Sequence, residues 1–430
     1  MQPWPPLARL TGMRNSLRVF AGVTAAALLA AGCGSSSAPA PKASGPIISR
    51  GVAAREPAAD PRPYGAADTA FGLDVLRAWC QAEPQANVVF SPASLATGLG
   101  MAYLGARGGT AQAMASVLHL PAVGSRQLEA GLQARSAALR GLDSPGVTLA
   151  DSNQVWADPS LITLRSYLNA VASGYGAGVA RVPLLKHPET ARAEINSAIA
   201  AATRGQIPQL LAPGSLGGVG WVLTDALYLH AAWAAPFNAG LTSPRPFTTA
   251  SGRTVTAKFM KGNDFPMAKA GGWTAVELPY LGGKLAMEAL LPDSGAGGCP
   301  ALSAATLDTI SAGLASGTRQ TAIALPKVSL SSSLRMNGLL SGLGMGVAFT
   351  PSADFTGLSP QACCIGFVQH AATLRVGEKG TVASAATAVG MLPAAAELEI
   401  AFNRPYLLLV TDTSTGEPLF MARVTNPLTG

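Results

Sequence analysis

The chain has 430 residues, of which 48% are hydrophobic and 12% charged, so it can bury a sizeable core and is not disordered along most of its length. Its formal net charge is +7, but Arg9, Arg14 and Arg18 lie in a segment that we expect to be removed, which leaves 27 basic against 23 acidic side chains. That balance argues against a nucleic-acid-binding protein, which needs a dense basic patch.

Residues 1–33 have the pattern of an export signal. Arg14 and Arg18 precede an apolar run over residues 19–31, which is too short to span a bilayer comfortably. Small residues then lead to Cys33, and a Gly/Ser segment follows. This arrangement resembles the lipobox of bacterial lipoproteins, in which the cysteine is lipidated after cleavage.

Two alternatives at this end of the chain stay open. Ordinary secretion would place the cleavage near Ala31, and translation could begin at Met1 or at Met13. We expect an exported protein, either anchored by a lipid at Cys33 to the outer face of the cell membrane or secreted. Residues 34–64 are rich in Pro, Ala, Ser and Gly without an apolar period, which predicts a flexible tether before a folded domain over residues 65–430.

The folded part begins with helical patterns and continues with strand-like ones. Helices are expected over residues 66–81, 92–104, 110–118, 127–142 and 189–203, and Ser91 caps the second of them. Strands are expected over residues 88–90, 147–156, 221–229, 273–278, 286–291, 321–325, 365–370 and 406–411. Helices early and strands late predict an α+β fold with antiparallel or mixed sheets.

Cysteines and histidines give no sign of a metal site or of catalysis. Export permits a disulfide, for example from Cys299 to Cys363 or Cys364, but with Cys80 also present the sequence does not fix the pairing. The four histidines have no metal-ligand spacing, and no nucleophile elbow, P-loop or dinucleotide fingerprint occurs. We therefore predict no cofactor, no metal and no catalytic residue.

The segment over residues 380–396 is wholly neutral and consists mostly of small side chains. If it formed a strand, Thr381, Ala383, Ala385 and Thr387 would share one face, because side chains alternate with a period of two. No proline precedes Pro393, so every amide before it can join a strand ladder. Such a segment could enter a sheet without burying charge or bulk, although composition alone also fits a flexible linker.

Motifs spread over residues 66–428 resemble the serpin family. They include the run over residues 87–94 at the start of a helix, the motifs at residues 195–196 and 203–207, and the strand at residues 225–228 with Trp233. They continue, in the family's order, with residues 278–280, 325–327 and 353–357, His370, and the motifs at 378–381, 402–406 and 420–427. The resemblance implies three β-sheets, about nine helices and an exposed reactive-centre loop at about residues 378–401.

The resemblance also assigns roles to individual residues. It implies a hinge at Glu378, Gly380, Thr381, Ala383, Ala385 and Thr387. It places shutter and breach residues, which control the opening of the large sheet, at Ser91, Ser94, Asp225, Trp233 and His370. Asp225 stands where the family usually has asparagine, so we expect its carboxylate to hold His370 protonated and make opening sensitive to pH.

The family's mechanism implies a suicide-type inhibitor of serine endopeptidases. Counting from Glu378 and back from Phe402 places the reactive bond between Ala394 and Ala395, preceded by Met391, Leu392 and Pro393. A small residue at the cleaved position fits elastase-like or subtilisin-like proteases, with cleavage after Leu392 by a chymotrypsin-like enzyme as a second option. The expected partner is the target protease in a covalent acyl complex, and the chain is expected to be monomeric.

Two other functions compete with inhibition. A non-inhibitory serpin-fold binding or structural protein would be expected to carry bulky or charged hinge residues, whereas Thr381, Ala383, Ala385 and Thr387 are small. A hydrolase lacks any supporting motif.

Overall fold

The computed structural model describes residues 45–293, 299, 301–381 and 399–429. The predicted export signal and lipidation site at Cys33, residues 34–44 of the predicted tether, and most of the predicted reactive loop lie outside these residues. Among the described residues, no helix combines the length and the apolarity needed to cross a membrane.

Eight α-helices occur in the described part of the chain, against about nine expected. They are α1 (Arg62–Ala82), α2 (Pro92–Tyr103), α3 (Gly108–Val117), α4 (Ser125–Arg140), α5 (Arg165–Tyr175), α6 (Pro188–Ala202), α7 (Ala304–Ala315) and α8 (Asn337–Leu340). The predicted cap of α2 is confirmed, because the Ser91 Oγ accepts a hydrogen bond from the Ser94 amide at 3.1 Å.

Sheet A has eight strands. Its order is β1 (Ile47–Ser49), β5 (Val179–Arg181), β4 (Gln154–Ala157), β6 (Trp221–Ala232), β14 (Gly380–Thr381), β13 (Val368–Gly377) and β12 (Val328–Arg335), with β3 (Val147–Asp151) also paired to β6. The expected strand at 147–156 is thus two strands. The expected strand at 365–370 is β13, which begins three residues later, at the first paired residue Val368, and runs on to Gly377.

Sheet B has nine strands. Its order is β15 (Glu399–Ala401), β11 (Gln320–Pro326), β8 (Thr254–Ala270), β9 (Trp273–Pro279), β10 (Leu285–Pro292), β16 (Tyr406–Asp412), β17 (Pro418–Val424) and β2 (Val88–Phe90), with β7 (Ser243–Thr248) paired to β8. β7, β11 and β15 gather around the first part of β8 and form the predicted third sheet. This third sheet is counted as part of sheet B because the 17-residue β8 belongs to both: its first part pairs with β7 and β11, and its last part pairs with β9.

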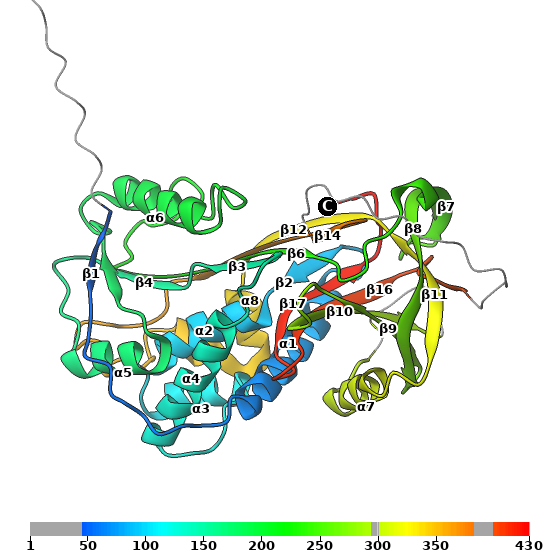
Figure 1. Ribbon diagram of the computed structural model, residues 1–430. Helices are drawn as coiled ribbons and strands as arrows, with labels where there is room; N and C mark the ends of the chain where they lie inside the picture. The colour runs from blue at the N-terminus through cyan, green and yellow to red at the C-terminus, as the bar shows by residue number, and fades with distance from the viewer. Residues whose placement is uncertain (1–44, 294–298, 300, 382–398, 430) are drawn as a thin grey trace, which may run out of the picture. The chain divides into compact units, whose positions relative to one another are not determined.

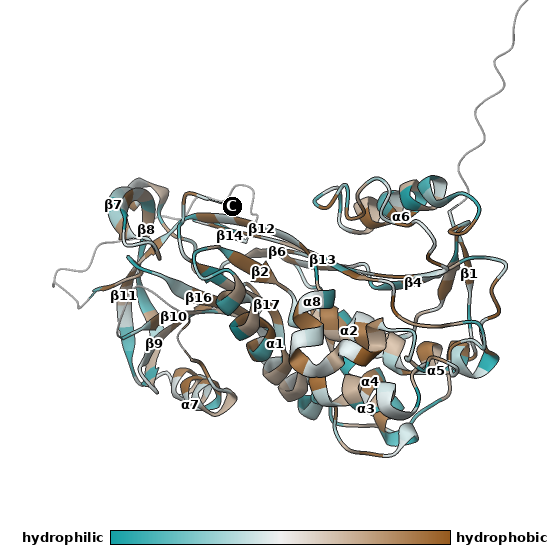
Figure 2. Ribbon diagram, turned by 180° about the vertical axis from the view of Figure 1, so that it is seen from behind, coloured by the Kyte–Doolittle hydropathy of each residue, from teal (hydrophilic) through white to brown (hydrophobic). Residues whose placement is uncertain are grey.

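Helices cover both faces of sheet A. Helix α6 lies on one face, and α2, α3, α4 and α8 lie on the other (Figure 1). The apolar residues of α6, Ile195 and Ile199, form a core with Trp156 and Val222 of the sheet. Seen from behind, α2 and α8 are rich in apolar residues, as burial on more than one side requires (Figure 2). The α+β class is confirmed.

The predicted tether is wrong from residue 45 onward. Ile48 of β1 pairs with Ala180 at the edge of sheet A, and the amide of Val52 donates to Asn169 Oδ1 at 2.9 Å. Helix α1 begins at Arg62, inside the predicted tether. Composition misled here because an edge strand takes its hydrogen bonds from a neighbouring strand and needs no apolar period of its own.

A disulfide joins Cys80 of α1 to Cys299, across a sequence separation of 219 residues. The suggested pairing of Cys299 with Cys363 or Cys364 is therefore wrong, and both of those cysteines carry free thiols. The bond attaches α1 to the segment before α7, two elements that sequence spacing does not relate.

Candidate functional site

The site lies along the junction between β6 and β13 in sheet A, which we call the seam. The two strands pair in parallel over five positions, from Val368 opposite Leu223 to Ala372 opposite Leu227. Beyond this closed end, β14 lies between them, with Thr381 paired to Ala231 on one side and to Val376 on the other. In the described part of the chain, residues 373–375 and 228–230 between these two regions do not pair with each other.

Thr381, near the start of the neutral segment and the last described residue before residue 399, is therefore already a strand residue. Its side chain is fully buried, and its Oγ1 lies 2.6 Å from the hydroxyl oxygen of Tyr280. The Tyr280 ring stacks on Trp233 with 4.5 Å between ring centroids. The indole Nε1 of Trp233 donates to the Gly377 carbonyl at 2.9 Å. The predicted breach residue Trp233 thus lies beside the predicted hinge residue Thr381, although the sequence analysis missed Tyr280 as the contact between them.

The hinge backbone requires glycine at position 380. Gly380 has φ +142°, and a Cβ there would lie 2.1 Å from the carbonyl oxygen of Ala231. Every other residue would be strained in this conformation and would collide with β6. Gly380 therefore allows the backbone to reach its place in β14, while its role as a hinge stays a prediction.

Glu378 fixes the chain just before this entry. Its carboxylate forms an ion pair with Lys327 at 2.8 Å and accepts a hydrogen bond from the Thr242 hydroxyl at 3.0 Å. Burial disfavours its ionisation, but the hydrogen bonds from Lys327 and Thr242 outweigh burial and lower the pKa of the Glu378 carboxyl. The predicted hinge therefore begins at a carboxylate that Lys327 and Thr242 hold in place.

The four predicted shutter residues meet under the seam. Asp225 and His370 pair across it, and the ring Nδ1 of His370 lies 2.9 Å from Asp225 Oδ1. The Ser94 hydroxyl donates to the same carboxylate oxygen at 2.6 Å, and the backbone amide of Ser91 donates to His370 Nε2 at 3.1 Å. All four are almost fully buried, and the structure places these predicted residues in one hydrogen-bonded group.

The expectation of a protonated His370 is wrong. Its Nε2 accepts a hydrogen bond from the Ser91 amide, which can only donate, so Nε2 carries no hydrogen. The single ring proton is on Nδ1 and is donated to Asp225. His370 is therefore neutral in this state. If Nε2 were protonated, its N–H would point at the N–H of Ser91, and neither donor would have an acceptor.

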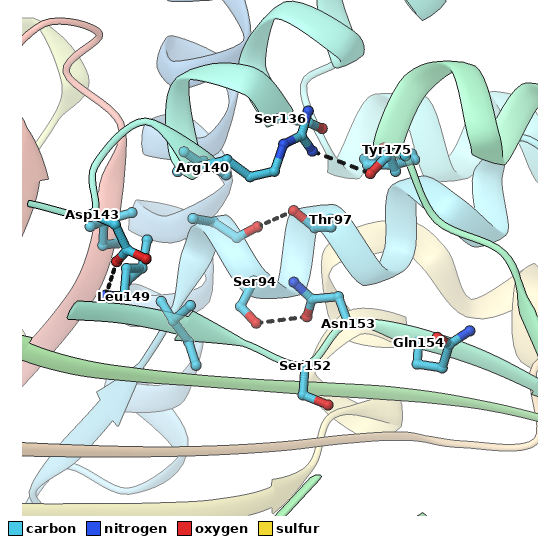
Figure 3. A pocket seen from close by; sticks show the side chains of 15 residues that line it. Ser94, Thr97, Ser136, Arg140, Asp143, Leu149, Ser152, Asn153, Gln154 and Tyr175 are labelled. Carbon is cyan, nitrogen blue, oxygen red and sulfur yellow. Dashed lines mark hydrogen bonds between the residues drawn. The ribbon is translucent and has the colours of Figure 1, made fainter. Parts of the chain in front are cut away.

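A cavity of about 640 Å³ adjoins the shutter. Figure 3 shows Ser94 and Asn153 facing each other at its wall, where the Ser94 Oγ lies 2.9 Å from Asn153 Oδ1. Asn153 lies between β3 and β4, and Leu149 of β3, the strand that pairs with β6, also lines the cavity. The sequence analysis did not identify Asn153.

The remaining predicted site residues lie outside the described part of the chain. They are the hinge residues Ala383, Ala385 and Thr387, the specificity residues Met391, Leu392 and Pro393, and the reactive bond between Ala394 and Ala395. Their placement stays a prediction. The described residues contain no cluster of three or more side chains able to hold a metal ion.

Comparisons with known proteins agree with this geometry. The sequence model of the family described as "Serpin (serine protease inhibitor)" matches residues 66–427. A leukocyte elastase inhibitor of Xenopus tropicalis is 30% identical over 84% of this chain and 98% of its own length. An uncharacterised serpin-like protein of Thermococcus kodakarensis is 31% identical over 80% of this chain and 82% of its own.

Solved structures show the same fold. A native thermophilic serpin, tengpin, superposes with a TM-score of 0.74 at 22% identity, covering 89% of this chain and 100% of that one. A native serpin of Arabidopsis, in the conformation described as stressed, also has a TM-score of 0.74, at 26% identity, covering 86% of this chain and 100% of that one.

Proposed function

The chain belongs to the serpin family of serine protease inhibitors, and on this premise we propose that it traps a serine protease by suicide inhibition. The protease cleaves the bond between Ala394 and Ala395 and stays attached as an acyl-enzyme. The freed segment then enters sheet A at the seam. One observation carries the proposal: Thr381 is already buried between β6 and β13 while the next positions of these strands are unpaired with each other.

Insertion is energetically sufficient to deform a protease. Residues 382–390 would continue β14 down the seam, and roughly ten new ladder hydrogen bonds at about 0.5–1.5 kcal/mol net each give on the order of ten kcal/mol. That is comparable to the whole stability of a domain. Catalysis needs close geometry, so a distorted protease cannot complete deacylation. In this mechanism the catalytic groups come from the protease.

Elastase-like or subtilisin-like proteases are the proposed targets. Ala394 offers a small side chain to a shallow pocket, and relatives of this chain bear the name leukocyte elastase inhibitor. Trypsin-like proteases, which require a basic side chain at the cleaved position, are expected to leave the loop intact.

The test mixes the purified chain with pancreatic-type elastase or with subtilisin. We expect a covalent complex that survives SDS, and a cleaved form that melts at a higher temperature than the intact one. Thr381→Arg would force a charge into the fully buried position between the strands, so this variant should be cleaved without forming a complex. Ser331→Arg, on the exposed side of β12, adds the same charge to the same sheet and should still form the complex.

The rival function is a non-inhibitory binding or structural role. Clean cleavage without a complex, together with an unchanged melting temperature of the cut chain, would establish that role and end the inhibitor proposal. A native mass equal to one chain before mixing is expected, since we propose a monomer.

We also propose that the protein acts outside the cell, attached through a lipid at Cys33 or secreted. The support is the sequence pattern at residues 14–33. Cys33→Ala should release the protein from the membrane fraction, whereas equal amounts of wild-type and variant in the medium would point to secretion without an anchor.

A further inference from the structure

Cys363 and Cys364 are adjacent free thiols just before β13, at the closed end of the seam. Their Sγ atoms lie 2.8 Å apart, against about 2.0 Å in a disulfide bond. Cys363 is exposed and Cys364 is half-buried. Neither the function proposed above nor the disulfide of Cys80 involves them.

The backbone around the pair is fixed on both sides but free in between. Before the pair, the Ala362 amide donates to the Ser359 carbonyl at 3.1 Å, and after it the Ile365 amide donates to the Ala348 carbonyl at 2.9 Å. In the part of the chain that the structure describes, the amides of Cys363 and Cys364 make no hydrogen bond. The backbone can therefore adjust to close a ring between the two sulfur atoms without breaking a ladder bond.

Cys364 also lies near the closed end of the seam. Together with Trp221 and Leu223 of β6 it lines a small, mostly apolar cavity of about 50 Å³. Leu223 pairs with Val368, the first residue of β13. Moving the Cys364 sulfur toward Cys363 would change the wall of this cavity, next to the end of the seam where the two strands are still joined.

We propose that Cys363 and Cys364 are a redox-active dithiol that exchanges with low-molecular-weight disulfides to form a vicinal disulfide, and that this conversion loosens the closed end of the seam. The proposal does not depend on protease inhibition, because both of its consequences can be measured on the isolated chain.

The two thiols have different roles in the exchange. Burial, followed by the hydrogen bond from Cys363 and its charge, raises the pKa of the Cys364 thiol to about 11, so the exposed Cys363 is the attacking group. Its thiolate attacks one sulfur of the disulfide RSSR, the S–S bond breaks, and one RS⁻ leaves and takes up a proton. The Cys364 thiol then loses its proton and attacks Cys363 Sγ, which releases the second RS⁻. Two protein thiols are oxidised, and one RSSR is reduced to two RSH.

The first experiment treats the full-length protein with oxidised glutathione and then alkylates the remaining thiols. We expect the peptide that contains Cys363 and Cys364 to lose two hydrogens and to carry neither glutathione nor alkyl groups. Cys364→Ser should stop at a stable glutathione adduct on Cys363, while Cys363→Ser should react more slowly. Glutathione on both cysteines of the wild type, or two thiols still open to alkylation, would overturn the proposal.

The second experiment measures hydrogen exchange in oxidised and reduced protein. Amides at residues 368–372 should exchange at least about threefold faster after oxidation, because local opening becomes less costly. Amides of α7, which packs on sheet B, serve as the internal control and should not change. The double variant Cys363→Ser/Cys364→Ser should show no response to glutathione. Equal exchange at 368–372 in the two forms would remove the link to the seam.

Discussion

Replacing Glu288 by glutamine should change how the stability of this protein depends on pH. Glu288 lies on β10 directly opposite Glu277 of β9 and is only 5% exposed. Its Oε1 accepts a long hydrogen bond of 3.4 Å from Ser311 of α7, and among the described residues its Oε2 has no partner. Burial, and secondarily the charge of Glu277, raises the pKa of Glu288 to about 7.

The magnitude follows from this pKa. Between the ordinary glutamate pKa of 4.5 and the raised pKa of about 7, the folded chain keeps a proton on Glu288 that the unfolded chain has lost. Stability must therefore fall as pH rises through this window, by up to about 3 kcal/mol. With an unfolding entropy of about 2.1 cal/mol/K per residue over residues 45–430, this corresponds to about 4 °C in Tm.

The assay is thermal unfolding, followed by circular dichroism, at pH 4.5 and pH 8. Glu288→Gln cannot ionise, so the variant should melt up to about 4 °C above wild type at pH 8 and close to wild type at pH 4.5. As a control, Asp308→Asn removes an exposed acid on α7, and this variant should melt at the same temperature as wild type at both pH values. A Glu288→Gln variant that loses as much stability as wild type between pH 4.5 and pH 8 would refute the argument.

Three further predictions concern other contacts. Deleting residues 45–59 removes β1 and its hydrogen bonds to β5, and should lower the free energy of unfolding, measured in urea, by about 2–3 kcal/mol. Cys80→Ser removes the disulfide to Cys299, which joins residues 219 positions apart, and should lower the free energy of unfolding by about 2–5 kcal/mol. Tyr280→Phe leaves the buried Thr381 hydroxyl unpaired and should cost about 1–3 kcal/mol; adding Thr381→Val should recover part of this loss in a double-mutant cycle.

Features encoded by neighbouring residues could be predicted from the sequence. The cap of α2 is an example, because Ser91 satisfies the amide of Ser94 only three positions along the chain. Gly380 is another, since a tight entry into a sheet favours the residue without a side chain. The resemblance to serpins also identified the shutter group, although not the protonation of His370, which depends on the direction of one backbone amide.

Features that depend on distant partners could not be predicted. Thr381 meets Tyr280 across 101 positions, and no local pattern marks the tyrosine as its partner. The same holds for the disulfide of Cys80, and for the buried Arg135, which binds Asp68 of α1 and Glu417 just before β17. In each case the fold creates the pair, whereas the sequence shows only an ordinary residue.

The shutter bond also bears on why the proposed insertion would wait for cleavage. The bond from His370 Nδ1 to Asp225 Oδ1 crosses the seam between paired positions. Neighbouring strands are about 4.8 Å apart, so a strand inserted between β6 and β13 would double the separation of these two residues. The bond would then have to break, and the buried Asp225 carboxylate would need a new donor. If the register of Thr381 continued down the seam, Thr387 would lie opposite both Asp225 and His370, and its hydroxyl would arrive with the strand as a new donor. Opening of the shutter without an entering strand would leave a buried charge short of hydrogen bonds, so the intact sheet stays closed below Thr381.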